Sequence, residues 1–264
     1  MRSPEELAVR LRELEAELGE PMTLDGLTRD FKIYQRRRGH RHSTDDLLTA
    51  WYAVTHAPAK VSTMLDLGTG IGSVGLSVAW HFRDAHLTAI EVQDISFRLL
   101  RENVWANGIE TRVETVHGDL RESTPVRTFD LVTGSPPYFD VKTGIVSADP
   151  QRAGARFELR GDVTDYCRVA RRTLASGGRF AFCFPTVQRA RAERACEGAG
   201  LPIVRTRDVV PKKGLPALFS LFVCRRDDDD GVHVEREPSF TVRDENGAHT
   251  GEMSRARAVF GMGV

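Results

Sequence analysis

The sequence predicts an α/β protein built on a doubly wound, mostly parallel sheet. Short apolar runs alternate along most of the chain with longer segments that repeat apolar residues at helical spacing. A glycine-rich turn, Gly68–Gly72, joins the first apolar run of this alternation to the helical segment that follows it. Alternation of strands and helices in this way is typical of a parallel sheet with helices on both faces.

The first predicted element is an amphipathic helix that precedes the sheet. The segment Ser3-Pro4-Glu5-Glu6 has the pattern of a capping box with proline at the first helical position, and Gly19 ends the helix. Leucines repeat along one face, at Leu7, Leu11, Leu14 and Leu18. This face can pack on the domain that follows, or on a second copy of the chain to give a homodimer.

Seven strands follow, at about residues 63–67, 86–92, 111–117, 129–134, 179–184, 203–210 and 217–224. Helices are expected at about residues 47–54, 73–82, 94–106, 163–175 and 187–199. We therefore expect an N-terminal helix (residues 1–22), a sheet domain (residues 23–226) and a C-terminal extension with a small strand pair (residues 227–264).

Composition sets further limits on the protein. The 264 residues are 41% hydrophobic, which is enough to bury a core, and the net charge is zero, which argues against retention on nucleic acid by bulk electrostatics. No run approaches the ~20 apolar residues of a membrane helix, and the acidic start is unlike a signal peptide, so we expect a cytoplasmic protein. The four cysteines lack C-x-x-C spacing and are expected to be buried free thiols, with no metal site.

The glycine-rich turn indicates a nucleotide-like ligand. Glycines allow a ligand to approach the backbone closely, and Glu91 ends the next strand, where it can accept hydrogen bonds from both hydroxyls of a ribose. The segment Gly70–Gly75 also fits the dinucleotide pattern, so an NAD enzyme is an alternative. Asp66 favours S-adenosylmethionine (SAM), because a carboxylate before the turn repels a pyrophosphate but attracts the ammonium of a methionine moiety.

A second motif, Gly134-Ser135-Pro136-Pro137-Tyr138-Phe139, follows the strand at residues 129–134. Two prolines fix the backbone in an extended form and leave carbonyl groups without partners along the chain. Together with the Ser135 hydroxyl and the ring face of Tyr138, these carbonyls can hold a planar amine. The motif therefore predicts a site for an amine acceptor.

These residues resemble the class I SAM-dependent methyltransferases, and among them the amino methyltransferases with an Asn/Asp/Ser-Pro-Pro-Tyr motif. The segment Gly118-Asp119-Leu120 fits as well, because the Asp of that family reaches the adenine amine of SAM. From about residue 24 to 252 the chain is similar to the bacterial valine-tRNA adenine-N6 methyltransferases. The segments that carry this similarity are Ile33-Tyr34-Gln35, Gly39, Asp45 with Leu47-Leu48, Ala155-Arg156-Phe157-Glu158 and His249-Thr250.

The resemblance implies a seven-stranded sheet with the last strand antiparallel, and methyl transfer from SAM to an exocyclic amine, adenine N6 of tRNA. It implies that SAM is bound by Asp45, Asp66, Gly68, Gly70, Glu91, Asp119 and Leu120. The implied catalytic residues are Ser135, Pro136 and Tyr138, with Phe139 beside the substrate. Where this chain has Ser135 the subfamily has Asn, and Ser-Pro-Pro-Tyr is the form found in cytosine-N4 DNA methyltransferases. Alternative acceptors are therefore DNA cytosine, a protein glutamine or a small-molecule amine.

Two arginine-rich segments are candidates for contacts with RNA phosphates. The cluster Arg36–His42 lies close in sequence to the expected mouth of the SAM site, and Arg38 and Arg41 are its predicted substrate-binding residues. The other segment runs from Tyr138 to Asp162 without clear periodicity and contains Arg152 and Arg156. Loops of this length in compact domains are often functional, so we expect this one to cover the substrate.

Overall fold

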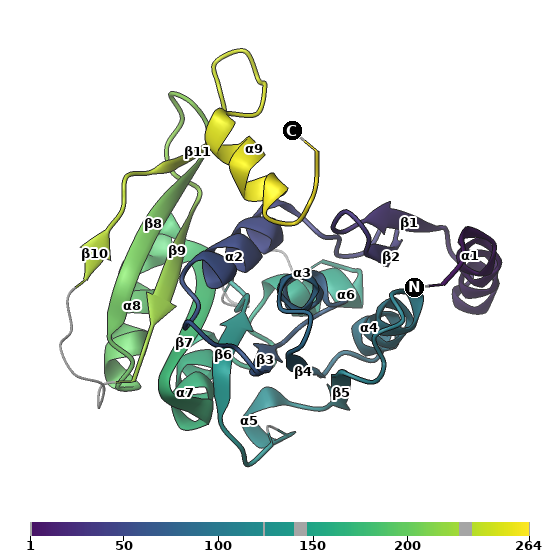
Figure 1. Cartoon of the computed structure of the whole chain (residues 1–264), viewed down its shortest axis with the longest axis horizontal. Helices are drawn as coiled ribbons and strands as arrows, with labels where there is room; N and C mark the ends of the chain where they lie inside the picture. Colours follow the sequence, from purple (N-terminus) through teal and green to yellow (C-terminus); the bar gives the residue numbers. More distant parts are fainter. Residues whose placement is uncertain (1, 124, 140–146, 227–233, 264) are drawn as a thin grey trace.

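The computed structural model of the chain describes residues 2–123, 125–139, 147–226 and 234–263. It shows a central sheet with helices on both faces, as predicted (Figure 1). The predicted strands are present as β3 (Thr63–Leu67), β4 (His86–Glu91), β5 (Val113–His117), β6 (Phe129–Gly134), β7 (Leu174–Pro185), β8 (Ile203–Lys212) and β9 (Phe219–Cys224). Their order across the sheet is β5-β4-β3-β6-β7-β9-β8, and β9 runs antiparallel to both of its neighbours.

The sheet has more strands than the seven predicted. The C-terminal extension adds β10 (Glu235–Arg236) and β11 (Phe240–Arg243), and each pairs in parallel with β8. The predicted small strand pair is therefore wrong, since these strands pair with the edge of the main sheet and not with each other. The outer edge of β8 offers free backbone donors and acceptors, which stabilise two short strands better than pairing of the two with each other would.

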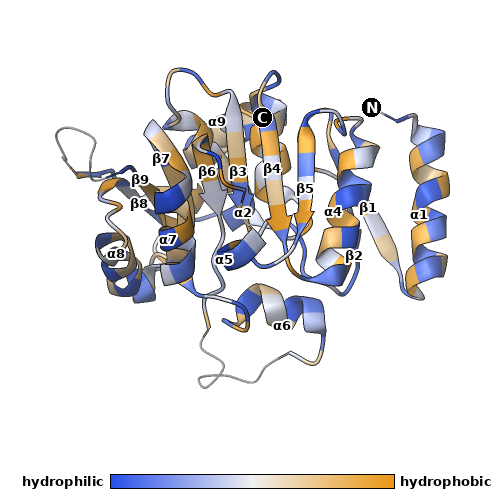
Figure 2. Ribbon diagram, turned by 90° about the horizontal axis from the view of Figure 1, so that it is seen from below, coloured by the Kyte–Doolittle hydropathy of each residue, from blue (hydrophilic) through white to orange (hydrophobic). Residues whose placement is uncertain are grey.

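The helices form two layers, one on each face of the sheet. One layer contains α2 (Thr44–Thr55), α3 (Ser73–His81), α4 (Asp94–Ala106) and the C-terminal α9 (Gly251–Ala258), and the other contains α5 (Leu120–Ser123), α7 (Val163–Thr173) and α8 (Arg189–Gly198). Alternate side chains of β3 face opposite layers, with Met64 packed in the first and Leu65 in the second. A further short helix, α6 (Pro150–Arg156), lies beyond the carboxyl ends of β4 and β5 (Figure 2).

The N-terminal helix, α1 (Pro4–Leu18), has the predicted capping box. The backbone N–H of Glu6 donates to Ser3 Oγ over 3.2 Å, and the N–H of Ser3 donates to Glu6 Oε2 over 2.7 Å. Leu7 and Leu14 are buried, and the hydroxyl of Tyr34 donates to the Leu7 carbonyl over 2.8 Å. The apolar face of α1 thus packs on its own domain.

A two-stranded antiparallel sheet connects α1 to the rest of the fold, and the sequence analysis did not predict it. Its strands are β1 (Met22–Gly26) and β2 (Lys32–Arg36). Asn103 of α4 holds β2 in place, since its side-chain oxygen accepts from the Tyr34 N–H over 2.6 Å and its amide donates to the Ile71 carbonyl over 2.8 Å. These bonds also tie the segment before the sheet to the glycine-rich turn.

The cysteines are free and buried, as predicted. Three of them form a row from the second helix layer to the sheet, with Sγ atoms 3.7 Å apart between Cys167 of α7 and Cys196 of α8 and 3.6 Å apart between Cys196 and Cys224 of β9. No group of three or more potential metal ligands occurs among the described residues. Within the same residues, no helix is long and apolar enough to cross a membrane.

Candidate active site

A pocket at the carboxyl ends of the parallel strands brings the two sequence motifs together. Its lining includes Asp66, Gly68 and Gly70 from the end of β3 and the turn after it, Glu91 from β4, Gly118 and Leu120 after β5, and Ser135 and Pro137 after β6. Neighbouring strands β3 and β6 place the motifs side by side, because Leu67 pairs with Gly134 in the sheet. Ligands of open α/β sheets bind at this edge.

The glycine-rich turn after β3 needs glycine for two different reasons. Gly70 has φ +61°, a left-handed conformation, and a side chain there would project into open space. Gly68 has φ +57°, and a Cβ atom there would come within 2.0 Å of the hydroxyl oxygen of Tyr166. The turn is therefore open toward the pocket at Gly70 and tightly packed at Gly68.

Asp66 is fully buried, and the chain itself supplies three hydrogen-bond donors to its carboxylate. Oδ2 accepts from Thr69 Oγ1 over 2.5 Å and from the Gly75 N–H over 3.0 Å, and Oδ1 accepts from Thr133 Oγ1 over 2.7 Å. Burial raises the pKa of this carboxyl, and these hydrogen bonds act against the rise. Asp66 thus fixes the glycine-rich turn against β6 and α3, in addition to lining the pocket.

Glu91 ends β4 with both carboxylate oxygens held by backbone donors. Oε2 accepts from the Gly70 N–H over 2.8 Å, and Oε1 accepts from the Gln93 N–H over 2.7 Å. Each oxygen keeps a second lone pair for a hydroxyl in the pocket. Burial raises the pKa of Glu91, against the effect of its backbone donors.

Asp119, a predicted cofactor residue, bonds to a neighbouring arginine and does not line the pocket. Its carboxylate accepts three hydrogen bonds from Arg121, from the backbone N–H and the guanidinium, over 2.6 to 2.9 Å. These bonds lower the pKa of Asp119. Gly118 and Leu120 on either side of it line the pocket, whereas Asp119 is not part of the lining.

The turn after β6 has acceptors that the described residues leave largely unoccupied. No described residue donates a hydrogen bond to the Pro136 carbonyl. Among the described residues the Ser135 hydroxyl has one hydrogen-bond partner, the Cys183 thiol, which donates to it over 3.8 Å, and Ser135 lines the pocket. Both groups are therefore available to accept N–H bonds from a planar amine.

Tyr138 is fixed at both ends of its side chain and through its backbone. Its hydroxyl donates to Asp45 Oδ2 over 3.2 Å, and its ring meets Phe184 edge to face at 5.7 Å. Its N–H donates to the Arg156 carbonyl over 3.0 Å, which ties the turn to the end of α6. Phe139, the next residue, is largely exposed. Asp45, predicted to bind the cofactor, thus contacts Tyr138 and is not part of the pocket lining.

The predicted substrate loop contains α6, a helix that the sequence analysis did not predict, and its residues 140–146 lie outside the described part of the chain. The basic cluster and α6 pack against each other through Gln151, which is buried. Oε1 of Gln151 accepts from Arg36 Nη1 and from the His40 N–H, each over 3.1 Å. Arg152 Nε donates to the Gly39 carbonyl over 3.2 Å.

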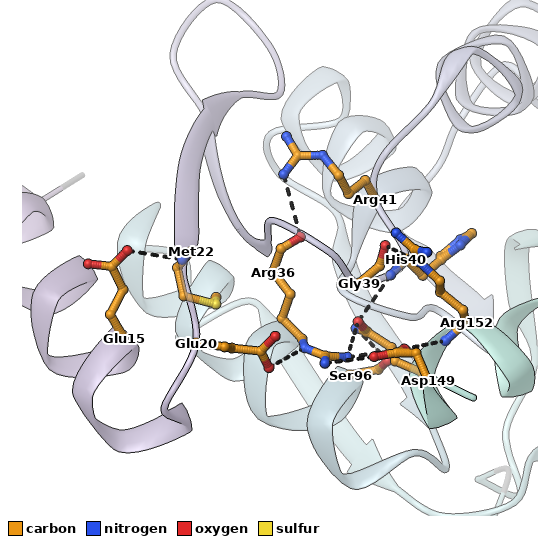
Figure 3. Close-up of polar contacts among 11 residues, drawn as sticks. Glu15, Glu20, Met22, Arg36, Gly39, His40, Arg41, Ser96, Asp149 and Arg152 are labelled. Atoms are coloured by element: carbon orange, nitrogen blue, oxygen red, sulfur yellow. Dashed lines mark hydrogen bonds and ion pairs between the residues drawn. The ribbon is translucent and has the colours of Figure 1, made fainter. Parts of the chain in front are cut away.

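The arginines of the basic cluster have different roles. Arg36 is mostly buried and forms ion pairs with Glu20 over 2.5 Å and Asp149 over 2.8 Å, so its guanidinium bonds within the protein (Figure 3). Arg41 pairs with Asp25 of β1 over 3.0 Å. Arg38 and Arg156 are exposed, and their guanidinium groups bond to no described residue.

Two pocket residues were missed by the sequence analysis. Asp46, at the start of α2, is nine-tenths buried and lines the pocket, although the resemblance pointed to its neighbour Asp45. Tyr166 of α7 is also buried, and its hydroxyl reaches the pocket without a hydrogen bond to any described residue. Helical periodicity alone assigns Tyr166 to the core, so only the close approach to Gly68 reveals its position.

The pocket fits SAM by the chemistry of its donors and acceptors. Glu91 offers acceptors to ribose hydroxyls, the turn at Gly70 lets a ligand approach the backbone, and Asp46 and Asp66 give one end of the pocket two carboxyl groups suited to an ammonium. The amine-binding turn at Ser135 borders the same pocket. The fold and this pocket define a class I SAM-dependent methyltransferase.

Residues 47–190, more than half of the chain, match the family model described as methyltransferase small domain. The chain belongs to this family and is a methyltransferase with SAM as its methyl donor.

Relatives and solved structures agree with this assignment. A tRNA1(Val) (adenine(37)-N6)-methyltransferase from Histophilus somni (strain 129Pt) is 29% identical over 192 residues, covering 70% of this chain and 77% of that protein. One from Aeromonas salmonicida (strain A449) is 33% identical over 162 residues, covering 60% of this chain and 65% of that protein. The crystal structure of a predicted O-methyltransferase from Agrobacterium tumefaciens superposes with a TM-score of 0.65 at 18% identity, covering 83% of this chain and 98% of that chain, which shows the shared fold.

Proposed function

We propose that this protein methylates the exocyclic N6 amine of adenine in tRNA. The observation that carries the proposal is the turn Ser135–Tyr138. Ser135 and Pro137 line the cofactor pocket, the Ser135 hydroxyl accepts only a long contact from the Cys183 thiol among the described residues, and none of these residues donates to the Pro136 carbonyl. Supporting evidence comes from relatives named as tRNA1(Val) (adenine(37)-N6)-methyltransferases. Arg38, Arg152 and Arg156, exposed around α6, offer cations to the phosphates of an RNA.

In this proposal the protein promotes the reaction mainly by orienting the acceptor amine. SAM supplies a sulfonium whose methyl group is open to attack by a nitrogen lone pair. Ser135 Oγ and the Pro136 carbonyl accept the two N–H groups of the amine, which aims the nitrogen lone pair toward the cofactor pocket. Tyr138, held by Asp45 and Phe184, stacks on the base. With SAM bound, the methyl group would pass to the amine nitrogen as its bond to sulfur breaks, and the methylated amine would release a proton to water, so the chain would need no dedicated base.

The pocket lies at the end of the sheet, so a base inside folded RNA has to turn out of its stack to reach Ser135. Phe139 and Phe157 lie beside each other, with ring centroids 5.7 Å apart, at the border between the turn and α6. Phe139 is the exposed member of this pair and is the proposed contact for the flipped nucleotide.

A second candidate is methylation of cytosine N4 in DNA, which the serine at position 135 favours. A hydroxyl is shorter than the amide of Asn and offers a rotatable acceptor in place of a fixed carbonyl. A protein glutamine and a small-molecule amine present the same planar N–H donors to this turn. Phosphate contacts distinguish nucleic acid from these two acceptors, because only nucleic-acid binding weakens steeply with salt.

The test is a transfer assay with methyl-labelled SAM on separate fractions of tRNA, DNA, protein and small molecules. We expect label in tRNA, and N6-methyladenosine in its nucleoside digest by mass spectrometry. Ser239→Ala, at an exposed serine outside the pocket, is the matched control for Ser135→Ala. Label in N4-methyl-2′-deoxycytidine or in protein with no label in adenosine would disprove the proposed acceptor.

A further inference from the structure

Asp46 is a buried carboxylate with one oxygen left without a partner. Asp46 Oδ2 accepts from Ser43, over 3.0 Å from the backbone N–H and 3.4 Å from the hydroxyl, as part of the capping box of α2. No described residue donates a hydrogen bond to Oδ1. The side chain is nine-tenths buried and borders the pocket. Oδ1 is therefore open to a hydrogen bond from a ligand in the pocket, and burial of most of the side chain makes a donor there favourable.

The surroundings of Asp46 favour a cationic donor. The charged groups that act most strongly on it are Asp45 on its own helix and Asp66 on β3, and both are acidic. The remaining titratable side chains of the pocket lining are His40, Glu91, Arg160 and Tyr166. Arg160, the one basic side chain of this described lining that is always charged, donates to the Val92 carbonyl over 3.4 Å.

Asp66 is the less suitable partner for a cation, although the sequence pointed to it. Three protein donors already occupy its two oxygens, from Thr69, Gly75 and Thr133. A carboxylate offers about four acceptor positions, so Asp66 keeps about one, on Oδ1. Asp46 keeps both acceptor positions of Oδ1, because no described residue donates to this oxygen.

We propose that the carboxylate of Asp46 binds the ammonium group of the methionine moiety of SAM, with Asp66 mainly holding the glycine-rich turn. This inference rests on SAM as the methyl donor and is independent of the acceptor. It assigns the amino-acid end of the cofactor to the space between the first turn of α2 and the end of β3.

Calorimetry with two ligands tests this assignment. S-adenosylhomocysteine carries the amino-acid end, whereas 5′-methylthioadenosine lacks it. For Asp46→Asn we expect S-adenosylhomocysteine to bind about 10- to 100-fold more weakly, since a charge-assisted hydrogen bond is lost, and methylthioadenosine to bind as it does to the wild type. Asp94→Asn is the matched control, because Asp94 also lies in the first turn of a helix but is 96% exposed.

Three outcomes would overturn the proposal. If Asp46→Asn binds S-adenosylhomocysteine as tightly as the wild type does, Asp46 does not bind the ammonium group. If that variant also transfers the methyl group more slowly, Asp46 would instead act on the acceptor amine. Equal weakening of both ligands would show a general loss of the pocket. If the wild type binds neither of these two ligands nor SAM, the assignment of SAM as methyl donor is wrong. This result is distinguishable from the first two, in which the wild type binds the ligands.

A measurement on the wild type keeps the test independent of the variant's folding. Burial and the neighbouring acids raise the pKa of Asp46, so this carboxyl keeps its proton to higher pH in the free protein than an ordinary carboxyl does. An arriving ammonium favours the carboxylate and displaces this proton. Titrations at pH 6.5 in buffers of different ionisation enthalpy should therefore show more proton release with S-adenosylhomocysteine than with methylthioadenosine, whereas equal release would contradict the proposal. Asp66 and Glu91 also have raised pKa values, and the Asp46→Asn variant separates their contribution.

Discussion

The hydroxyl of Tyr138 donates a hydrogen bond to Oδ2 of Asp45 over 3.2 Å, which joins the turn after β6 to the first turn of α2. Asp46, the next residue along α2, faces the cofactor pocket. The first turn of α2 therefore has two roles. Asp45 holds Tyr138, the proposed stacking residue, and Asp46 borders the cofactor pocket. A shift of α2 would move both parts of the site together.

Removal of the hydroxyl alone should affect turnover more than cofactor binding. Tyr138→Phe keeps the ring but loses the bond to Asp45, so we expect kcat to fall about 3- to 10-fold, as for one neutral-to-charged hydrogen bond of modest geometry. The affinity for S-adenosylhomocysteine should stay within about 2-fold of the wild type. Tyr138→Ala, which also removes the stacking ring, should lower kcat further. Single-turnover kinetics and calorimetry check both statements, and equal kcat values for the Phe and Ala variants would refute the stacking role.

Ser135 is the position at which this chain departs from the family that it resembles. Ser135→Ala should lower methyl transfer about 10- to 100-fold through the loss of one acceptor in the transition state, with little change in SAM affinity. Ser135→Asn should preserve or raise activity on tRNA adenine, because Asn supplies a fixed carbonyl acceptor. If Ser135→Ala is fully active on the true acceptor, Ser135 does not bind the amine. The Pro136 carbonyl and Tyr138 would then hold the amine alone.

Most of the sheet was predictable because each of its strands is a short apolar run between turn residues. The runs at 63–67 and 129–134 match β3 and β6 residue for residue. The small sheet of β1 and β2 escaped prediction, since its residues alternate poorly and its stability comes from Asn103, which is distant in the sequence. The partner of β10 and β11 is equally non-local, and a strand pattern does not specify which edge it joins.

The site was predictable where chemistry lies in local motifs, and less so where it depends on the direction of a side chain. The glycine-rich turn, Glu91 and the Pro-Pro turn meet at one pocket. Sequence does not say that Asp45 faces Tyr138 while Asp46 faces the pocket, because adjacent helical residues differ by about 100° in direction. Nor does it distinguish Arg36, which bonds within the protein, from the exposed Arg38 in the same cluster.

Arg36 should contribute to stability and its neighbour Arg37 should not. Arg36→Ala leaves Glu20 and Asp149 without their partner and disconnects β2 from α6, so we expect a loss of about 1–3 kcal/mol in the free energy of unfolding. Arg37→Ala, at an exposed side chain without a described ion pair, should change it by less than about 0.5 kcal/mol. Urea denaturation measures both. Similar values for the two variants would show that the Arg36 contacts contribute little.

The exposed arginines around α6 should act on RNA affinity without affecting the fold. Arg38→Ser and Arg156→Ser should each weaken tRNA binding and reduce the slope of log K against log salt by about 1, as expected for one lost phosphate contact. Arg194→Ser, at an exposed arginine on α8, is the matched control and should leave the slope unchanged. Binding is measured by fluorescence anisotropy between low and physiological salt. An unchanged slope in both test variants would place the RNA elsewhere.

Asp46 should also make the free protein less stable as the pH rises. Its pKa is raised above the ordinary value by burial and by Asp45, so the folded state binds this proton more tightly than the unfolded state does. The stabilising effect of the proton is complete below the unfolded pKa of about 3.9 and is lost as the pH rises through the folded pKa. Asp46→Asn cannot ionise, so its free energy of unfolding relative to the wild type should increase as the pH rises from 4.5 to 7.5. Saturating S-adenosylhomocysteine should reduce this difference, because the ammonium then compensates the wild-type carboxylate. Urea denaturation across this pH range measures the difference, and a value independent of pH would mean that Asp46 ionises without cost in the folded protein.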